Sequence, residues 1–381
     1  MQLMAHVRSA TEILKQYDGK IPFAAWLKGY FKEHKKFGSK DRRLVADLCF
    51  CYFRLGHALP QFSVEDRILA GQALCHPESA FVAQAKPEWL PAENLSLAEK
   101  LNFLQDGAGQ QLFPFPEKIS PELDRQAFVL SFLHQPDVFL RLRPGKEKAV
   151  VETLKKEGIS FQQEGACLRL SHGTKADAVL RIDEDVVVQD ASSQRVLDPL
   201  KAVQKQAKFS AWDCCAASGG KTVLLHDAYP KAALTVSDIR ESILHNLRNR
   251  LKRAGITNFR SFVADVSSPQ FSLSQKFDVI ICDAPCSGSG TWGRTPEQLV
   301  YFQKEKIAHY ASLQQSIATN ASRYLKKDGF FLYITCSVFS DENEQITERL
   351  QQTTGMQLLS QQYFKGYEKK ADTLFAALFT I

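Results

Sequence analysis

The stretch from residue 207 to residue 225, AKFSAWDCCAASGGKTVLL, constrains the fold of this chain more than any other. A short apolar run closes on Asp213, a turn of small residues follows, and a helix-compatible run starts at Lys221. Strand, glycine turn and helix in this order form the first half of a βαβ unit. Gly219 and Gly220 let the backbone pass close to a ligand or adopt a positive φ. We therefore expect a parallel sheet with a ligand site at this turn, where the amides of the helix start are free.

The turn excludes two common nucleotide-binding motifs. A P-loop needs a glycine five residues before Gly-Lys-Thr, and this chain has Cys215 there; the fingerprint G-x-G-x-x-G is also absent. An acidic residue at a strand end with two glycines suits a ligand that has a ribose and an amino-acid tail but no phosphate, namely S-adenosylmethionine. A βα turn without a ligand is the alternative.

Size and composition set further bounds. With 381 residues the chain is long enough for two or three domains, and no apolar run approaches the roughly 20 residues that cross a bilayer. The N-terminus lacks the apolar core of a signal peptide. The nine cysteines include no CxxC pair, so we expect no metal site and a reducing cytoplasm.

Helical periodicity dominates the first 105 residues, and Ser39 is the expected N-cap of the third helix. Seven Lys and Arg residues oppose two acidic ones between residues 28 and 43, with Tyr30, Phe31 and Phe37 among them. This cluster is either a solvated helical face or a surface that binds RNA phosphates by releasing counterions. The expected helices span residues 10–17, 23–34, 41–59, 63–74 and 96–103.

A Gly- and Pro-rich stretch, residues 106–121, is typical of a linker and precedes a small α/β module. Modules of this size often present RNA, but no aromatic RNP signature is visible, so a structural role is the alternative. The module's expected helices span residues 124–133 and 146–157, and its expected strands span residues 138–142, 159–162, 167–170 and 185–188.

From residue 189 on, strands and helices alternate, which predicts a doubly wound parallel sheet with ligands beyond the carboxyl ends of its strands. Asp238 follows the second strand and is placed to bind ribose hydroxyls, and Asp265 follows the third, near an adenine; helix capping is the alternative for both. The expected strands are 209–212, 234–236, 261–264, 278–282, 330–334, 356–359 and 375–379, and the expected helices are 222–227, 241–253, 304–325 and 343–352.

Two cysteines follow the fourth and fifth of these strands. Cys286 lies in DAPCSGSGT and Cys336 in TCS. If the two strands are neighbours, about 5 Å apart, both thiols face one crevice; a buried inert cysteine is the alternative. A thiolate that adds to carbon-6 of a cytosine makes carbon-5 nucleophilic, Asp283 could hold the exocyclic amine and ring nitrogen, and a second thiol could help release. The base must first leave any helical stack.

Four segments resemble the NOL1/NOP2/Sun family of RNA 5-methylcytosine methyltransferases, and most closely its bacterial Sun (Fmu) ribosomal RNA enzymes. They are residues 213–222 (DCCAASGGKT), 283–291 (DAPCSGSGT), 335–337 (TCS) and 189–194 (QDASSQ). The resemblance covers residues 189–381 well, and FGSKDRR at residues 37–43 is similar to the NusB-like helical domain of those enzymes.

The resemblance implies that Cys336 is the nucleophile and that Cys286 assists release. Three positions depart from the family: Ser218 stands in place of Pro, Gly293 in place of an Arg that precedes Arg294, and Ile243 in place of an Arg. The resemblance also implies S-adenosylmethionine contacts from Cys215, Ala216, Ala217, Ser218, Gly219, Gly220, Lys221, Asp238, Asp265 and Asp283.

We therefore expect an α/β protein with a Rossmann-like class I methyltransferase domain, a seven-stranded, mostly parallel sheet, preceded by an all-α NusB-like domain and a small α/β module. The expected boundaries are 1–117, 118–188 and 189–381. The expected activity is cytosine-C5 methylation of ribosomal RNA by a cytoplasmic monomer that uses S-adenosylmethionine. Transfer RNA as the substrate, or a non-catalytic RNA-binding assembly factor, are the alternatives.

Overall fold

A computed structural model describes residues 2–90 and 94–381 as two compact units. The helical unit comprises the chain up to residue 119 together with residues 124–135 and 291–304. The sheet unit comprises residues 120–123, 136–290 and 305–381. None of the helices in the described ranges combines the length and the apolar character needed to cross a bilayer.

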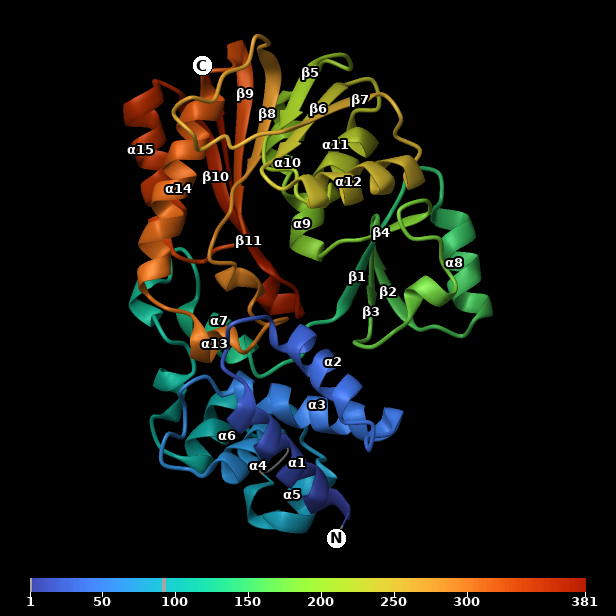
Figure 1. The fold of residues 1–381 in the computed structure, drawn as a ribbon, viewed down its shortest axis with the longest axis vertical. Helices are drawn as coiled ribbons and strands as arrows, with labels where there is room; N and C mark the ends of the chain where they lie inside the picture. The colour runs from blue at the N-terminus through green and yellow to red at the C-terminus, as the bar shows by residue number, and fades with distance from the viewer. Residues whose placement is uncertain (1, 91–93) are drawn as a thin grey trace. The chain divides into compact units, whose positions relative to one another are not determined.

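The helical unit is built around a core of aromatic and aliphatic side chains from α1 to α4. Ile13, Phe23 and Phe53 are fully or almost fully buried in it. Ser63 caps α4 by accepting a hydrogen bond from the Asp66 amide at 3.1 Å. The helices of this unit are α1 (Gln2–Gln16), α2 (Phe23–Glu33), α3 (Ser39–Arg54), α4 (Val64–Cys75), α5 (Ala80–Ala85), α6 (Leu97–Leu104), α7 (Arg125–Ser131) and α13 (Gln298–Tyr301), with 3-10 turns at Pro87–Trp89, Ala108–Gln111 and Pro116–Lys118 (Figure 1).

The five helices predicted for this part exist, but two local predictions are wrong. Gly38, not Ser39, is the N-cap of α3, because the Asp41 carboxylate accepts the Gly38 amide at 3.1 Å and Ser39 is already helical. The stretch 106–121 is not a free linker: Phe113 is buried and stacks on Trp292, with ring centroids 5.5 Å apart. Apolar residues within a Gly- and Pro-rich stretch therefore belong to the core.

The sheet unit contains the predicted seven-stranded, mostly parallel sheet, in the order β10-β11-β9-β8-β5-β6-β7. Within it β11 runs antiparallel to both neighbours. Helices α11 and α12 cover one face and α14 and α15 the other (Figure 1). The strands are β5 (Ser210–Asp213), β6 (Ala233–Asp238), β7 (Phe259–Val263), β8 (Phe277–Asp283), β9 (Leu325–Thr335), β10 (Gln357–Lys365) and β11 (Thr373–Thr380). The helices are α9 (Ala191–Arg195), α10 (Asp198–Val203), α11 (Gly220–Ala228), α12 (Glu241–Arg253), α14 (Glu305–Ser322) and α15 (Glu344–Thr354), with 3-10 turns at Ser289–Thr291, Ser340–Glu342 and Gly366–Lys369.

A second, antiparallel sheet in the same unit has the order β2-β3-β1-β4 and packs its apolar side chains against α8 (Glu147–Lys156). Its strands are β1 (Val138–Leu142), β2 (Phe161–Glu164), β3 (Cys167–Leu170) and β4 (Val186–Val188), with a 3-10 turn at Ala176–Ala178. The strand predicted at 159–162 begins two residues late, because the Ile159 amide still donates to the Leu154 carbonyl at the end of α8. The fold class is thus a Rossmann-like α/β domain with a small α/β module and helices before it.

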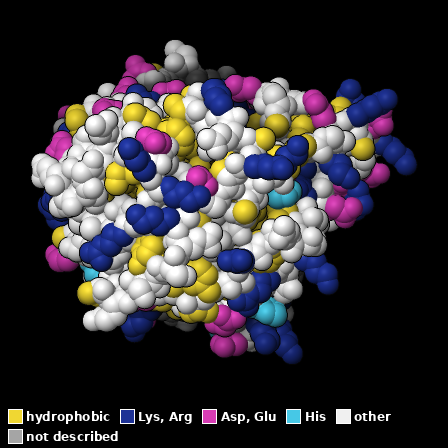
Figure 2. All heavy atoms as spheres, turned by 90° about the horizontal axis from the view of Figure 1, so that it is seen from above, with side chains coloured by type: hydrophobic (Ala, Val, Ile, Leu, Met, Phe, Trp, Pro, Cys, Tyr) yellow, Lys and Arg dark blue, Asp and Glu magenta, His cyan; other side chains and the backbone are white. Residues whose placement is uncertain are grey.

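The two ends of the large sheet are distinguished by where its parallel strands begin and where they end. Phe330 of β9 pairs with Thr380 of β11, so the end of the sheet beside the C-terminus is where the parallel strands begin. Figure 2 looks onto this end and shows Lys and Arg side chains spread among hydrophobic and uncharged ones. The predicted site residues follow the strands and therefore lie at the opposite end.

Candidate active site

The glycine turn after β5 is fixed by hydrogen bonds to β6. The Ala216 amide donates to the Ser237 carbonyl at 2.9 Å, and the Ala217 amide donates to the Asp238 carboxylate at 3.0 Å. Gly219 adopts φ +82°, and a Cβ there would come within 3.1 Å of a side chain of α12. Only glycine satisfies both conditions without strain. The turn therefore presents its backbone at the start of α11, where polar ligands bind readily.

Two further residues of the turn, Cys215 and Ser218, make contacts with neighbouring side chains. The half-buried thiol of Cys215 lies against those of Cys214 and Cys282. Ser218 is exposed, and the Arg250 guanidinium donates to its carbonyl and its hydroxyl, each at 3.3 Å. This contact from α12 restrains the turn at Ser218, the position where the family that the sequence resembles has proline.

The acidic residues after β6 and β7 have different surroundings. Asp238 is buried, and its carboxylate accepts hydrogen bonds from the Arg240 amide and side chain, both at 3.0 Å. Asp265 is exposed and accepts the Ser267 amide at 3.0 Å within its own turn. Asp238 is thus placed beside the glycine turn, while Asp265 stabilises a local turn at the neighbouring strand end.

Lys221 and Asp283 form an ion pair between the start of α11 and the end of β8. The Lys221 ammonium lies 2.5 Å from an Asp283 oxygen. Burial favours the neutral amine, but the charges of Asp283 and Cys336 outweigh it and raise the pKa of Lys221. The Lys221 ammonium is thus held at the strand ends, beside Asp283 and near Cys336.

The two cysteines of interest meet at the ends of adjacent parallel strands. β8 pairs with β9 so that Asp283 lies opposite Ile334, and the sulfurs of Cys286 and Cys336 are 3.3 Å apart. Both side chains are half buried. The hydrogen bond to Cys336 and burial raise the pKa of Cys286 well above its ordinary value. Cys286 therefore favours its neutral thiol form, and its sulfur lies within hydrogen-bonding distance of the Cys336 sulfur.

A buried carboxylate that the sequence analysis missed ties the two cysteine loops together. Glu342 is fully buried and accepts hydrogen bonds from the Ser287 amide at 2.8 Å and the Ser337 hydroxyl at 2.8 Å. Gln314 of α14 donates to the same carboxylate and to the Pro285 carbonyl, both at 2.9 Å. An acidic residue in the polar stretch SDENEQ carries no sequence signal of burial, so only the structure could identify it.

Gly290 and Asn343 make further contacts that hold the cysteine loops in place. The Gly290 amide donates to the Cys336 carbonyl at 2.9 Å, and a Cβ on Gly290 would lie 2.0 Å from the Thr373 carbonyl oxygen. Asn343 accepts from the Thr335 hydroxyl at 2.6 Å and donates to the Ser337 carbonyl at 2.9 Å. The positions of both sulfurs are therefore set by backbone contacts on each side.

In the basic cluster of residues 28–43 the aromatic side chains are buried and the cations are exposed. Tyr30, Phe31 and Phe37 are buried in the helical core, so they are not available to stack on bases. The cations of the cluster are all exposed on α2, α3 and the turn between them: Lys28, Lys32, Lys35, Lys36, Lys40, Arg42 and Arg43.

A cavity of about 1080 Å³ lies elsewhere in the sheet unit, between the small sheet and α9. Its wall includes Arg169, Arg195, Phe364 and Lys369, and seven Lys and Arg residues there are nearly balanced by five acidic ones. The QDASSQ segment contributes to this wall, where the Gln189 side chain accepts a hydrogen bond from the Arg141 guanidinium at 2.8 Å. The two facing thiols lie outside this cavity, so we place the chemistry at the strand ends.

Residues 200–376 match the family described as 16S rRNA methyltransferase RsmB/F. Two curated relatives carry the name Ribosomal RNA small subunit methyltransferase B. One, from Photorhabdus laumondii subsp. laumondii, is 34% identical over 177 residues, 45% of this chain and 40% of the relative. The other, from Citrobacter koseri, is 37% identical over 188 residues, 49% of this chain and 43% of the relative. The chain thus spans less than half of the length of either relative.

Solved structures resemble the fold at greater length. The crystal structure of PH0851 has a TM-score of 0.73 at 19% identity and covers 99% of this chain and 98% of its own. The structure of NSun6 from Pyrococcus horikoshii with SFG has a TM-score of 0.58 at 16% identity and covers 70% of this chain and 96% of its own. At these identities the likeness establishes the fold.

Proposed function

We infer the activity of this chain from the family that its segment 200–376 matches, the 16S rRNA methyltransferases of the RsmB/F type. We propose that it methylates carbon-5 of a cytosine in RNA, and specifically in ribosomal RNA. The observation that carries the proposal is the pair of sulfurs, 3.3 Å apart, beside the Lys221–Asp283 ion pair. Few other reactions require two facing thiols next to a carboxylate and an ammonium group.

In the first step the Cys336 thiolate attacks carbon-6 of the cytosine, and a sulfur–carbon bond forms while carbon-5 gains the electron pair of the ring double bond. The Lys221 ammonium supplies a positive charge beside the site of attack. Asp283, at the tip of the adjacent strand, accepts a hydrogen bond from the exocyclic amine and, in its protonated form, donates one to the ring nitrogen, which favours the negative charge that develops on the ring. Carbon-5 is then nucleophilic enough to accept a methyl group.

Release reverses the addition. The proton on carbon-5 passes to solvent, its electron pair forms the ring double bond again, and Cys336 departs from carbon-6 as a thiolate. We assign Cys286 to this step because its thiol faces Cys336 and the network of Glu342 holds its loop in place.

S-adenosylmethionine supplies the methyl group, and the turn after β5 fits such a ligand. We propose that residues 215–221 and Asp238 hold it, with Asp283 at the boundary between cofactor and base. The positive φ of Gly219 and the buried carboxylate of Asp238 support this, since an open loop beside an acidic group suits a ribose and an amino-acid tail. Asp265 would reach the adenine only if its hydrogen bonds to Ser267 open.

For the remainder of the chain we propose RNA binding. The exposed cations between Lys28 and Arg43 would neutralise RNA phosphates, and the division into residues 1–117, 118–188 and 189–381 would separate two RNA-binding domains from the methyltransferase domain. We further propose that the chain acts as a monomer, in the cytoplasm, where ribosomal RNA is found.

Transfer of a labelled methyl group from S-adenosylmethionine to small-subunit ribosomal RNA, to transfer RNA and to no RNA tests the proposal. We expect label in ribosomal RNA and none after Cys336→Ala, while cofactor binding by that variant stays within about twofold because Cys336 faces the base. Full turnover by Cys336→Ala would contradict the assignment of the nucleophile. Label in transfer RNA alone would favour the rival substrate. RNA binding without transfer to either would favour the assembly factor.

A further inference from the structure

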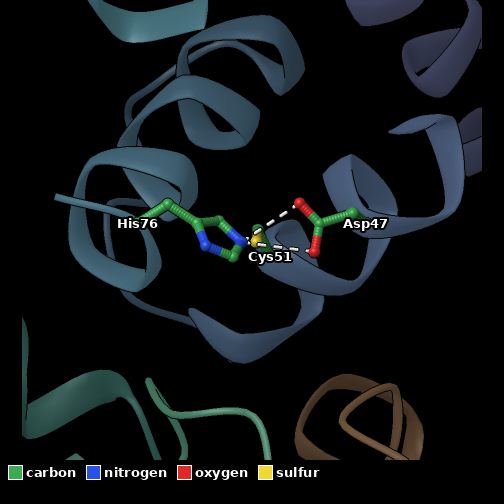
Figure 3. A group of neighbouring side chains, drawn as sticks. All are labelled: Asp47, Cys51 and His76. Carbon is green, nitrogen blue, oxygen red and sulfur yellow. Dashed lines mark hydrogen bonds and ion pairs between the residues drawn. The ribbon is translucent and has the colours of Figure 1, made fainter. Parts of the chain in front are cut away.

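Three side chains that can bind a metal ion meet at one point in the helical unit, away from the cysteines of the proposed reaction. A carboxylate oxygen of Asp47, the sulfur of Cys51 and a ring nitrogen of His76 all lie within 4.8 Å of one another (Figure 3). His76 Nε2 is 3.1 Å from one Asp47 oxygen and 3.2 Å from the other. Cys51 is buried, while the side chains of Asp47 and His76 are about half exposed, at 48% and 46%. Solvent can therefore deliver an ion to the group.

Two packed helices bring these residues together. Asp47 and Cys51 are four residues apart on α3 and so lie on one face, one turn from each other. Cys75 ends α4 and His76 is its C-cap. Gly71 allows the close approach, because a Cβ there would lie 2.4 Å from the Cys51 carbonyl oxygen. The three donors thus come from both helices, two from α3 and one from the end of α4.

An amide outside the group orients two of its members. Gln72 is buried, and its side-chain nitrogen donates to an Asp47 oxygen at 2.8 Å and to the Cys51 sulfur at 3.2 Å. The Ser79 hydroxyl in turn donates to the Gln72 oxygen at 3.0 Å. Metal ligands are commonly held by such outer hydrogen bonds, and a donor shared by a carboxylate and a sulfur stabilises negative charge on both.

We propose that Asp47, Cys51 and His76 bind a divalent transition-metal ion of the zinc class. The Cys75 thiol hydrogen-bonds to Cys51 but is not one of the three mutually close ligands, so a water molecule supplies the fourth donor. Sulfur, imidazole nitrogen and carboxylate oxygen are the ligands that Zn²⁺ accepts, at about 2.0–2.3 Å in a tetrahedron. Such bonds place the ligand atoms on the order of 3.3–3.8 Å apart, and the three atoms here lie within 4.8 Å of one another. The Cys51 thiol loses its proton to solvent as the ion binds.

The ion pair of Asp47 with His76 and the Gln72 amide bound to Cys51 hold these side chains in pairs, but neither accounts for the convergence of the sulfur and the imidazole. A metal ion accounts for all of them and also for the amide that points at both Asp47 and Cys51. The ion would fasten the end of α4 to the middle of α3, so its role is structural. We therefore expect it to raise the thermal stability of the chain without entering the reaction.

The test uses the full-length chain, stripped with a chelator under reducing conditions and titrated with Zn²⁺ or Co²⁺. We expect one ion per chain by elemental analysis, a higher Tm with the metal, and a Co²⁺ spectrum with thiolate charge-transfer and tetrahedral bands. A wild-type chain that binds no metal would overturn the proposal.

Variants locate the site. Asp47→Asn and His76→Gln keep the size of half-exposed side chains, so they should fold, as circular dichroism can verify, and should bind at least about tenfold more weakly. Cys51→Ser should reduce the thiolate charge-transfer band, and Cys75→Ser should leave it in place. The matched controls Cys167→Ser and His57→Gln should bind as the wild type does. Wild-type affinity in Asp47→Asn and His76→Gln, with loss in Cys336→Ala, would assign the metal to the other thiols and refute the site.

Discussion

Among single residues, Asp213 is unusual because it can still hold its proton near neutral pH, where most aspartates are ionised. It ends β5, is buried, and one of its oxygens accepts the Thr222 hydroxyl at 2.7 Å. Its other oxygen has no hydrogen-bond partner among the described residues. Burial raises its pKa to about 7. The glycine turn is therefore anchored to a carboxyl group that changes charge in the physiological range.

Asp213 makes stability depend on pH. Its pKa is about 7 in the folded state and about 3.9 in the unfolded state, so the folded state binds the extra proton between these values. The free energy of unfolding should fall as pH rises from about 4 to about 7, by up to ~1.4 kcal/mol per unit, and then level off. Asp213→Asn keeps an oxygen for Thr222 and removes the titration.

Chemical denaturation of both proteins at several pH values measures this effect. The difference in the free energy of unfolding between Asp213→Asn and the wild type should grow in favour of the variant as pH rises to about 7. Parallel curves for the two proteins would show that Asp213 is ionised throughout.

Among elements, the 3-10 turn Ser340–Glu342 positions two loops at once. The Glu342 carboxylate joins the Cys286 loop, the Cys336 loop and α14 through Ser287, Ser337 and Gln314. Burial raises its pKa, yet three donors point at it. The separation of the two sulfurs therefore depends on a residue that touches neither of them.

Glu342→Ala should leave these three donors unpaired and let the loops move apart, so that methyl transfer falls about 10- to 100-fold with little change in RNA affinity. Glu342→Gln should recover most of the activity, because its amide oxygen can accept the Ser287 amide and its nitrogen can donate to the Ser337 hydroxyl. Separate kcat and KM values for both variants check this. Equal loss in the two variants would contradict a positioning role.

The elements themselves were largely predictable, because apolar runs and helical spacing are local properties. The ends of the elements were not predictable. The N-cap of α3 is Gly38, supported by Asp41, whereas the residue types alone place the cap at Ser39. The approach of Cys286 to Cys336 could be predicted from two strand ends, given that the strands are neighbours. Glu342 and the group of Asp47, Cys51 and His76 could not, because their burial and convergence depend on packing between distant segments.

Across the sheet unit, one buried carboxylate joins the small sheet to the large one. Arg141 and Arg143 of the β1 region pair with Asp227 of α11 at 2.6 and 2.7 Å, and the three side chains are almost fully buried. Charges buried in this way are costly when one partner is lost. The docking of the small sheet therefore depends on Asp227.

Asp227→Asn should destabilise the chain by about 3–5 kcal/mol, because two arginines keep their charges in a buried place without the carboxylate. Hydrogen exchange of β1 and β3 should quicken more than that of β8. Asp198→Asn is the control: its pairs with Arg195 and Lys201 are exposed, so it should change stability by less than about 1 kcal/mol. Equal effects of the two variants would contradict a buried docking pair.

The covalent bond between Cys336 and RNA is the centre of the account. The direct measurement incubates Cys286→Ala with S-adenosylmethionine and ribosomal RNA and separates the products on a denaturing gel. We predict a protein–RNA band that resists denaturant and that disappears in the double variant Cys286→Ala, Cys336→Ala. Normal turnover by Cys286→Ala without such a band, or a band that persists in the double variant, would contradict the mechanism.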